Sequence, residues 1–195
     1  MKKLTLSEFL YETLILYNTK FIFGIPGSHV LPLYNELRKQ HKISLIDVYH
    51  ENTASYMASM YGYLEGNPGV CLVTAGPGAT NAATGVAHAF SSSIPMIIIT
   101  GGVPTNGMNE SFHGNDSNLF LSNLFQTITK KSFRIENVRQ FDKILLNAFK
   151  IALSGRKGPV HIEIPIDIQS DNNAIFRTPS ALSEIPSSYL LNFHT

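Results

Sequence analysis

Short apolar runs alternate along most of the chain with segments whose apolar side chains recur every three or four residues. The runs predict strands, and they lie at residues 21–23, 43–49, 70–74, 95–100 and 160–165. The segments with helical spacing lie at residues 6–17, 30–37, 53–64, 76–90, 119–125 and 141–152. Strands that alternate with helices at this spacing form parallel sheets whose two faces are covered by helices. We therefore expect an α/β fold, a three-layer α/β/α domain with a mainly parallel sheet of about six strands.

Local signals mark the ends of several of these helices. Thr5 and Glu8 have the spacing of a capping box, and Pro32 can occupy the first turn of a helix at no cost in hydrogen bonds. Residues 66–69 read Gly-Asn-Pro-Gly and should end one helix, while Ser154-Gly155 should end the last long one. The helix at residues 53–64 carries Ala, Ser and Gly at positions that would let another helix approach closely.

The chain of 195 residues has the length of one ordinary domain. Residues 1–169 carry the periodic pattern, whereas residues 170–195 are rich in Ser, Asn and Pro and lose it, so we expect a linker or tail toward a further domain there. Residues 103–118 form a long polar segment between a strand and a helix, and loops of this length in compact domains tend to be functional.

Composition excludes several classes of function. The net charge of +1 gives no electrostatic basis for binding nucleic acid or an anionic membrane. The apolar runs are far shorter than the ~20 residues that cross a bilayer, and a soluble cytoplasmic protein is expected. The single cysteine, Cys71, lies within an apolar run, so a disulfide within the chain is excluded and a buried, inert thiol is expected.

Three loops follow predicted strands and should meet at one edge of the sheet, where open α/β sheets bind ligands. They are residues 24–28, 50–52 and 75–81. The second loop contains Glu51, a lone carboxylate, and taken by itself such a residue is more often solvated or helix-capping than functional. The third loop is rich in glycine and opens a helix, but Asn81 stands where the dinucleotide-binding fingerprint has its third Gly. A nucleotide-binding Rossmann domain is therefore disfavoured, and structural turn glycines remain an alternative.

Metal and hydrolase sites find no support in the sequence. No two histidines have the H-x-x-x-H spacing, and none of those in the loops (His29, His50 and His113) has a cysteine nearby. Neither Ser28 nor residues 91–93 lie in a G-x-S-x-G elbow. We expect no metal ligands in this chain and no serine hydrolase triad.

Four ordered motifs together resemble a known family. They read FGIPGS at residues 23–28, HEN at 50–52, LVTAGPGATN at 72–81 and GPVHIEIP at 158–165. The segment from about residue 4 to 170 is similar to the N-terminal pyrimidine-binding domain of thiamine diphosphate-dependent enzymes, and most similar to the acetolactate synthase and pyruvate oxidase group. The resemblance implies the thiamine diphosphate-binding fold and a 2-oxo acid substrate such as pyruvate. It also implies acetolactate synthase-like decarboxylation and carboligation, as used in branched-chain amino acid biosynthesis.

The resemblance assigns roles to individual residues. Glu51 matches the Glu that protonates N1′ of the aminopyrimidine, so that the 4′-amino group can act as a base on the cofactor. The other implied cofactor-binding residues are Ile25, Pro26, Pro77 and Asn81. The implied substrate-facing residues are Gly27, Ser28, Phe112 and His113, with the loop that carries Phe112 and His113 placed over the site of a partner subunit. A homodimer or tetramer is implied, with the site formed between subunits.

Departures from the family pattern leave alternatives open. The family holds the cofactor's diphosphate and its magnesium ion in another domain through a Gly-Asp-Gly motif, which this sequence lacks. The chain is thus expected to be an inactive part of a larger enzyme, either a fragment or a separate subunit. Residues 26–28 resemble the benzoylformate decarboxylase branch instead, and Ile166 replaces a Lys of acetolactate synthase. A decarboxylase subunit (benzoylformate or sulfopyruvate decarboxylase-like), a non-catalytic assembly or regulatory domain, and the presence or absence of FAD all stay open.

Overall fold

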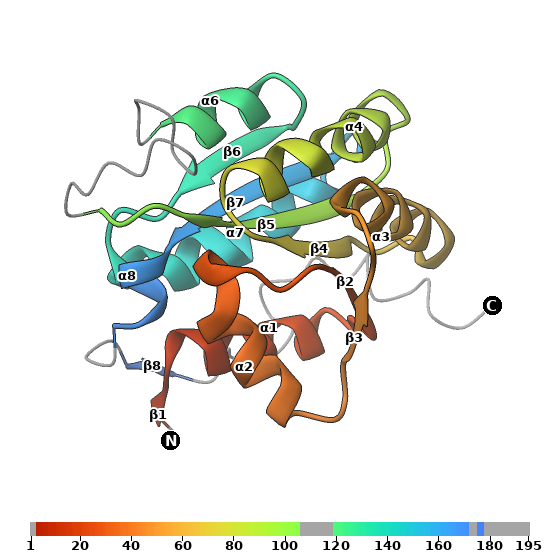
Figure 1. Cartoon of the computed structure of the whole chain (residues 1–195). Coiled ribbons are helices and arrows are strands. Elements are labelled where there is room, and N and C mark those ends of the chain that lie inside the picture. The colour runs from red at the N-terminus through yellow and green to blue at the C-terminus, as the bar shows by residue number, and fades with distance from the viewer. Residues whose placement is uncertain (1–2, 106–118, 172–174, 178–195) are drawn as a thin grey trace.

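The computed structural model describes residues 3–105, 119–171 and 175–177, and its centre is a six-stranded parallel sheet (Figure 1). Its strands are β2 (Phe21–Gly24), β3 (Ser44–Asp47), β4 (Gly69–Val73), β5 (Met96–Gly102), β6 (Lys131–Arg134) and β7 (Pro159–Pro165). They lie in the order β3-β2-β4-β5-β7-β6, and every neighbouring pair is parallel. The expected sheet is confirmed.

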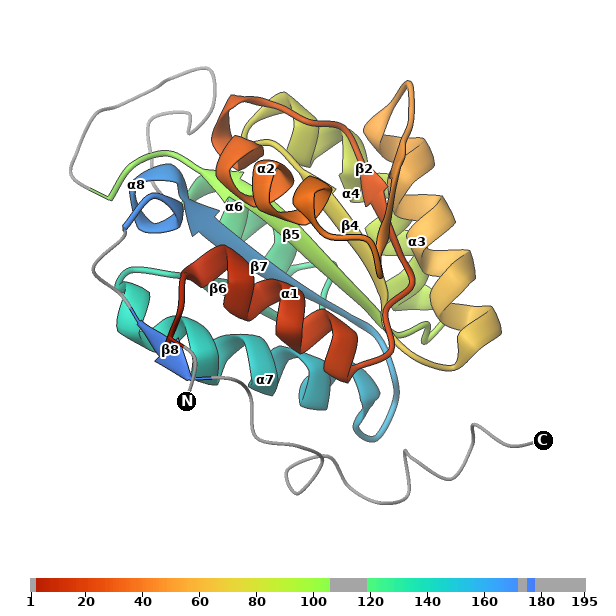
Figure 2. The ribbon, with the colours of Figure 1, turned by 90° about the horizontal axis from the view of Figure 1, so that it is seen from below.

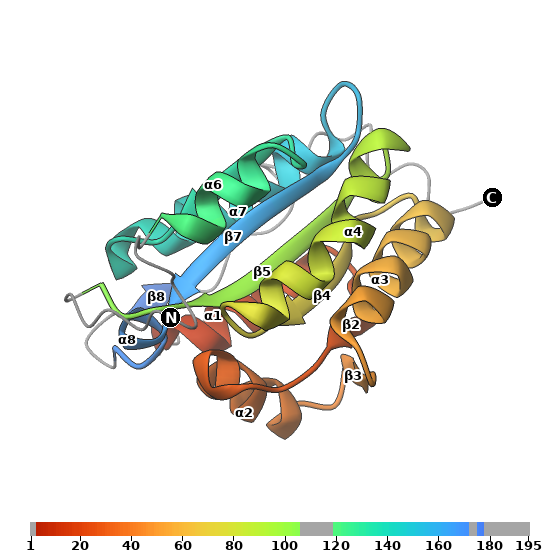
Figure 3. The ribbon, with the colours of Figure 1, turned by 45° about the horizontal axis from the view of Figure 1, so that its top comes forward.

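Helices cover both faces of the sheet, which confirms the three-layer fold. One face packs against α1 (Leu6–Leu16), α2 (Leu31–Lys39) and α7 (Phe141–Leu153). The other face packs against α3 (Glu51–Glu65), α4 (Pro77–Ser91) and α6 (Phe120–Gln126). Figure 2, seen from below, shows α1 and α7 side by side in front of the sheet, and Figure 3 shows α3, α4 and α6 on the opposite face. The short elements are η1 (Ser28–Val30), η2 (Val138–Gln140) and α8 (Ile166–Gln169).

Strand β4 shows why the central strands read as continuous apolar runs. Val70 and Leu72 lie in the core between the sheet and helices α1 and α2, whereas Cys71 and Val73 lie in the core between the sheet and helices α3 and α4. Successive side chains of a strand point to opposite faces, so every position of a strand covered on both sides is buried and most positions carry apolar residues. Burial raises the pKa of the Cys71 thiol, as expected for an inert cysteine.

The predicted helix ends are confirmed. The Thr5 hydroxyl accepts a hydrogen bond from the Glu8 amide at 3.3 Å, and the Glu8 carboxylate accepts one from the Thr5 amide at 2.8 Å. Pro32 lies in the first turn of α2. Gly66, with φ of 65°, ends α3 in the left-handed conformation that glycine adopts without strain.

The two edge strands differ from the prediction. The strand predicted at residues 43–49 is longer than the observed one. Strand β3 ends at Asp47, and Tyr49 is fully exposed. Strand β6 was not predicted at all. It lies at the opposite edge, pairs with β7, and carries exposed and half-buried residues rather than an apolar run. Edge strands are covered less completely, so their sequences carry a weaker apolar signal.

A second, two-stranded sheet joins residues 3–4 to residues 176–177. Strand β1 (Lys3–Leu4) pairs antiparallel with β8 (Phe176–Arg177). The Phe176 ring is buried and lies 5.1 Å from the Phe9 ring, and burying such a side chain stabilises a fold by roughly 1.5–3 kcal/mol. Residues 176–177 thus pack on the domain although they lie beyond the expected boundary at 169, and a linker in residues 170–195 stays a prediction. No helix within the described part of the chain is long and apolar enough to cross a bilayer.

The close helix contact expected at residues 53–64 occurs within the chain, between α3 and α4. Ala54 and Ala58 of α3 are fully buried against α4. At Gly85 of α4, a Cβ atom would lie 2.2 Å from the Ser55 hydroxyl and 2.8 Å from the Tyr56 amide nitrogen. The two helix backbones therefore meet at a distance that only glycine permits at this position.

We expect Gly85→Ala to lower the free energy of unfolding by about 1–3 kcal/mol, because the added methyl group forces α3 and α4 apart. This loss should appear although alanine favours helices over glycine by ~1 kcal/mol. Urea denaturation measures the change. Exposed Thr84→Ala is the control on the same helix, and a Gly85→Ala protein as stable as the wild type would contradict the proposed contact.

Candidate functional site

Glu51 and Asn81 meet at the edge of the sheet where the strands have their carboxyl ends. Glu51 is the first residue of α3, and the Asn81 side-chain amide donates a hydrogen bond of 3.0 Å to one of its carboxylate oxygens. The preceding residue, His50, caps the helix by accepting a bond from the Asn52 amide at 3.1 Å. Glu51 is half-buried. The structure thus joins two residues that are thirty positions apart and were both predicted for the site.

Two glycines hold the loops of this edge together by packing on Thr74, which follows β4. A Cβ atom at Gly27 would lie 2.6 Å from the Thr74 Cβ, and one at Gly78 would lie 2.7 Å from the Thr74 methyl group. The same atom at Gly78 would lie 3.4 Å from Glu51 Oε1. Larger residues would displace the loops, so the loop after β2 and the start of α4 both depend on glycine here.

The loop between strand β4 and helix α4 also contains the predicted Pro77. Gly76 has φ of 61°, a conformation that other residues rarely adopt, and it lets the chain turn sharply from the strand into the helix. Pro77 is the first residue of α4, where its missing amide hydrogen costs nothing. The Pro77 ring is half-buried at the same edge as Glu51.

The remaining predicted residues fall into two groups. Ile25, Pro26 and Gly27 are half-buried in the loop after β2, and Ser28 is exposed at the start of η1. This loop lies at the same edge of the sheet, where Gly27 packs on Thr74. Phe112 and His113 lie outside the described residues.

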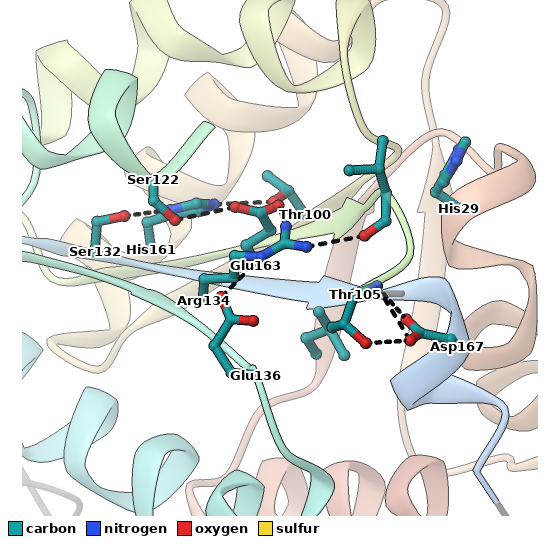
Figure 4. Close-up of polar contacts among 12 residues, drawn as sticks. His29, Thr100, Thr105, Ser122, Ser132, Arg134, Glu136, His161, Glu163 and Asp167 are labelled. Atoms are coloured by element: carbon teal, nitrogen blue, oxygen red, sulfur yellow. Dashed lines mark hydrogen bonds and ion pairs between the residues drawn. The ribbon is translucent and has the colours of Figure 1, made fainter. Parts of the chain in front are cut away.

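A buried polar cluster that was not predicted occupies the other half of the sheet (Figure 4). His161 of β7 lies between the hydroxyl groups of Thr100 and Ser132, at 2.9 Å from Nε2 and 2.7 Å from Nδ1. The Phe125 ring lies 4.3 Å from the imidazole ring. Complete burial lowers the pKa of His161 to about 3, so the ring is neutral near pH 7.

A buried ion pair between Arg134 and Glu163 lies beside this histidine. Their side chains are 3% and 2% exposed, and Ser122 donates a further hydrogen bond of 3.0 Å to the Glu163 carboxylate. Arg134 also donates to the Val103 carbonyl oxygen at 3.0 Å and pairs with exposed Glu136 at 3.0 Å. Burial raises the pKa of Glu163 to about 7, although the charge of Arg134 and the two hydrogen bonds oppose this shift.

The two clusters differ in what they can do chemically. The Glu163 carboxylate is enclosed by Arg134 and Ser122 and is inaccessible, so it serves the packing of β5, β6 and β7. Glu51 is half-buried and lies beside a glycine, so its carboxylate can contact a bound molecule. Among the described residues, no group of three or more His, Cys, Asp or Glu side chains is placed to hold a metal ion.

Comparisons with known proteins identify relatives of this chain. A family model described as "Thiamine pyrophosphate enzyme, N-terminal TPP binding domain" matches residues 4–127. A probable acetolactate synthase large subunit of Methanococcus aeolicus is 41% identical over 84% of this chain and 26% of its own length. The mitochondrial acetolactate synthase catalytic subunit of Saccharomyces cerevisiae is 35% identical over 96% of this chain and 26% of its own length.

A third relative extends the same result to bacteria. The acetolactate synthase isozyme 1 large subunit of Escherichia coli is 36% identical over 94% of this chain and 32% of its own length. The chain thus spans between about a quarter and a third of the length of these curated relatives. The predicted family resemblance is confirmed.

The buried Glu163 predicts a specific pH dependence of stability. Its pKa is about 7 in the folded protein against an ordinary value of 4.5, so its stabilising contribution is complete below pH 4.5 and is lost as the pH rises through 7. Relative to Glu163→Gln, the wild type should therefore lose roughly 3 kcal/mol of stability between pH 4.5 and 8. His161 is present in both proteins, so its own titration cancels.

Denaturant unfolding at a series of pH values measures this difference. Glu136→Gln is the matched control, because exposed Glu136 contacts the same guanidinium group and should keep the wild-type slope. If the wild type and Glu163→Gln change in parallel over this range, the raised pKa is contradicted.

Proposed function

Because the chain belongs to the family of N-terminal TPP-binding domains of thiamine pyrophosphate enzymes, we propose that it binds the aminopyrimidine half of thiamine diphosphate at Glu51. We further propose that the complete enzyme decarboxylates a 2-oxo acid and joins the product to a second one, as acetolactate synthases do. The observation that carries the proposal is the hydrogen bond between Asn81 and Glu51 at the carboxyl edge of the sheet. The names of the relatives support the reaction class.

The surroundings of Glu51 fit a planar ring with a nitrogen that needs a proton. Asn81 holds one carboxylate oxygen, and the backbone of Gly78 leaves the approach to the other oxygen free of a side chain. When bound, thiamine diphosphate would supply a nucleophilic carbon for the carbonyl group of the substrate, and the protein would orient the cofactor and set its protonation. Glu51 would share a proton with ring nitrogen N1′, and Ile25, Pro26 and Pro77 would line the pocket.

The rest of the cofactor would be held outside these 195 residues. The sequence lacks Gly-Asp-Gly, the motif by which enzymes of this family bind diphosphate and magnesium, and the described residues contain no metal-binding cluster. The chain also spans only part of the length of its relatives. We therefore propose that a diphosphate-binding domain, from the same or a partner subunit, completes the active site and that the isolated chain is inactive.

A decarboxylase is the second candidate, and one observation favours it. Ser28 is exposed at the start of η1, and its hydroxyl lies 3.0 Å from Nδ1 of His29, so a hydroxyl–imidazole pair stands beside the proposed site. Such a pair could move a proton to a product that is released rather than joined to a second 2-oxo acid. Analysis of the products formed from pyruvate would separate the two reactions.

The exposed face of α3 is the surface that we propose for contact with a second copy of the chain. Five large apolar or aromatic side chains of this helix are 37–77% exposed: Tyr56, Met57, Met60, Tyr63 and Leu64. Apolar side chains gathered on one helix face often mark a protein interface. A homodimer through this face would place the start of α3, and with it Glu51, close to the partner subunit.

We expect Glu51→Gln to reduce turnover of a 2-oxo acid by the complete enzyme by about 10²–10⁴-fold, because an amide cannot exchange the proton with N1′. The assay must be run at saturating thiamine diphosphate, so that weaker cofactor binding does not account for the loss. Exposed Glu65→Gln at the other end of α3 is the matched control and should be active. Wild-type turnover by Glu51→Gln would remove the basis of the proposed function.

The proposed subunit contact predicts that Met60→Glu yields a monomer, because a charge would be buried against the partner. Leu31→Glu is a matched control, since Leu31 of α2 is 45% exposed and Met60 is 44% exposed. Sedimentation velocity of the purified protein distinguishes the species. A monomeric wild type, or a Met60→Glu protein that still dimerises, would show that α3 is not the interface.

A further inference from the structure

Gln169, a residue of the one-turn helix α8, links the segment after β2 to the end of β7, which lies three strands away in the sheet. The Gln169 side chain is only 6% exposed, and its amide nitrogen lies 2.6 Å from the His29 carbonyl oxygen and 2.6 Å from the Ile164 carbonyl oxygen. Both partners are acceptors, so the nitrogen must donate to both, which fixes the orientation of the amide group. Gln169 therefore joins the end of β7 to the backbone of η1.

His29 is held from two further directions. Its backbone amide donates to the Thr74 hydroxyl at 3.3 Å. On β5, a Cβ atom at Gly101 would lie 2.4 Å from the His29 carbonyl oxygen, so the two backbones are in direct contact. The segment of Gly27, Ser28 and His29 thus lies across the ends of β4 and β5 and is fastened at its far end by Gln169.

Helix α8 also holds the segment that follows β5. Both carboxylate oxygens of Asp167 accept hydrogen bonds from the Thr105 amide, at 3.2 and 3.1 Å, and one of them accepts the Thr105 hydroxyl at 2.5 Å (Figure 4). Two residues that are two positions apart on α8, Asp167 and Gln169, therefore anchor two different loops at the carboxyl edge. The loop held by Gln169 contains Gly27 and Ser28, the residues expected to face the substrate.

We propose that Gln169 is a positioning residue, which sets how Gly27 and Ser28 face the reacting end of the cofactor without touching cofactor or substrate. The proposal rests on the proposed function of the site. Gln169 has no hydrogen bond to Glu51 or Asn81, so its loss should move the substrate-facing loop and leave the pyrimidine pocket in place. A displacement of about 1 Å at such a loop can reduce the rate of a reaction on the order of 10²-fold.

Gln169→Glu in the complete enzyme tests this role, because a carboxylate has the same shape and cannot donate to the two carbonyl oxygens. We expect kcat/KM for the 2-oxo acid to fall about ten- to hundredfold, while the Kd of thiamine diphosphate stays within about twofold. A residue that serves only the overall fold would change both quantities together. Exposed Gln140→Glu is the matched control and should leave both unchanged.

Hydrogen exchange of the backbone amides of residues 28–31 separates this proposal from the proposed function. In Gln169→Glu these amides should exchange faster, whereas those at the start of α4 should not. If Gln169→Glu does not fold, Gln169→Met removes the donors at similar volume and takes its place. Unchanged exchange or unchanged kcat/KM would overturn the positioning role, whereas full activity of Glu51→Gln would overturn the function and leave the exchange result standing.

Discussion

The complete burial of the central strands on both faces is the constraint on which the rest of this structure depends. Strands β4 and β5 are covered by helices above and below, so their side chains are almost entirely apolar. Apart from the enclosed cluster around His161 and Glu163, the polar side chains that can reach a bound molecule therefore lie in the loops at the ends of the strands. Because all six strands are parallel, the loops after them converge on one edge, and residues distant in the sequence meet there.

Close backbone packing then fixes how these loops lie relative to one another. Thr74 is in contact with the backbones of Gly27 and Gly78, and Gly101 is in contact with the backbone of His29. These contacts place the carboxylate of Glu51, the first residue of α3, next to Gly78 at the start of α4, and they hold the loop after β2 across the neighbouring strands. The small residues in the sequence motifs thus allow the backbones of neighbouring loops and strands to approach one another closely.

Much of this arrangement could be predicted from the sequence. Strands buried on both faces have continuous apolar runs, and these runs predicted the central strands of the sheet. Helix ends carry local signals, such as Thr5 and Gly66. The meeting of Glu51 with Asn81 followed from the rule that parallel strands place their loops at one edge. The roles of these residues in cofactor binding remain predictions.

Other features could not be predicted because their signals are not local. Strand β6 lies at an edge and lacks an apolar run, so only its pairing with β7 defines it. The ion pair of Arg134 with Glu163 joins residues on two strands, and the alternation of His161 and Glu163 with apolar residues in one strand does not show that both are buried. The hydrogen bond from Gln169 to His29 spans 140 positions of the chain, and no local pattern in either segment predicts it.

The central claim is that Glu51 meets the aminopyrimidine ring of thiamine diphosphate. A crystal structure of the complete enzyme with the bound cofactor tests it most directly, through the distance between the Glu51 carboxylate and ring nitrogen N1′. The account predicts a hydrogen bond of about 2.7–2.9 Å, with Asn81 still bonded to the other carboxylate oxygen. A cofactor ring bound elsewhere, or one that leaves Glu51 in contact with protein alone, would contradict it.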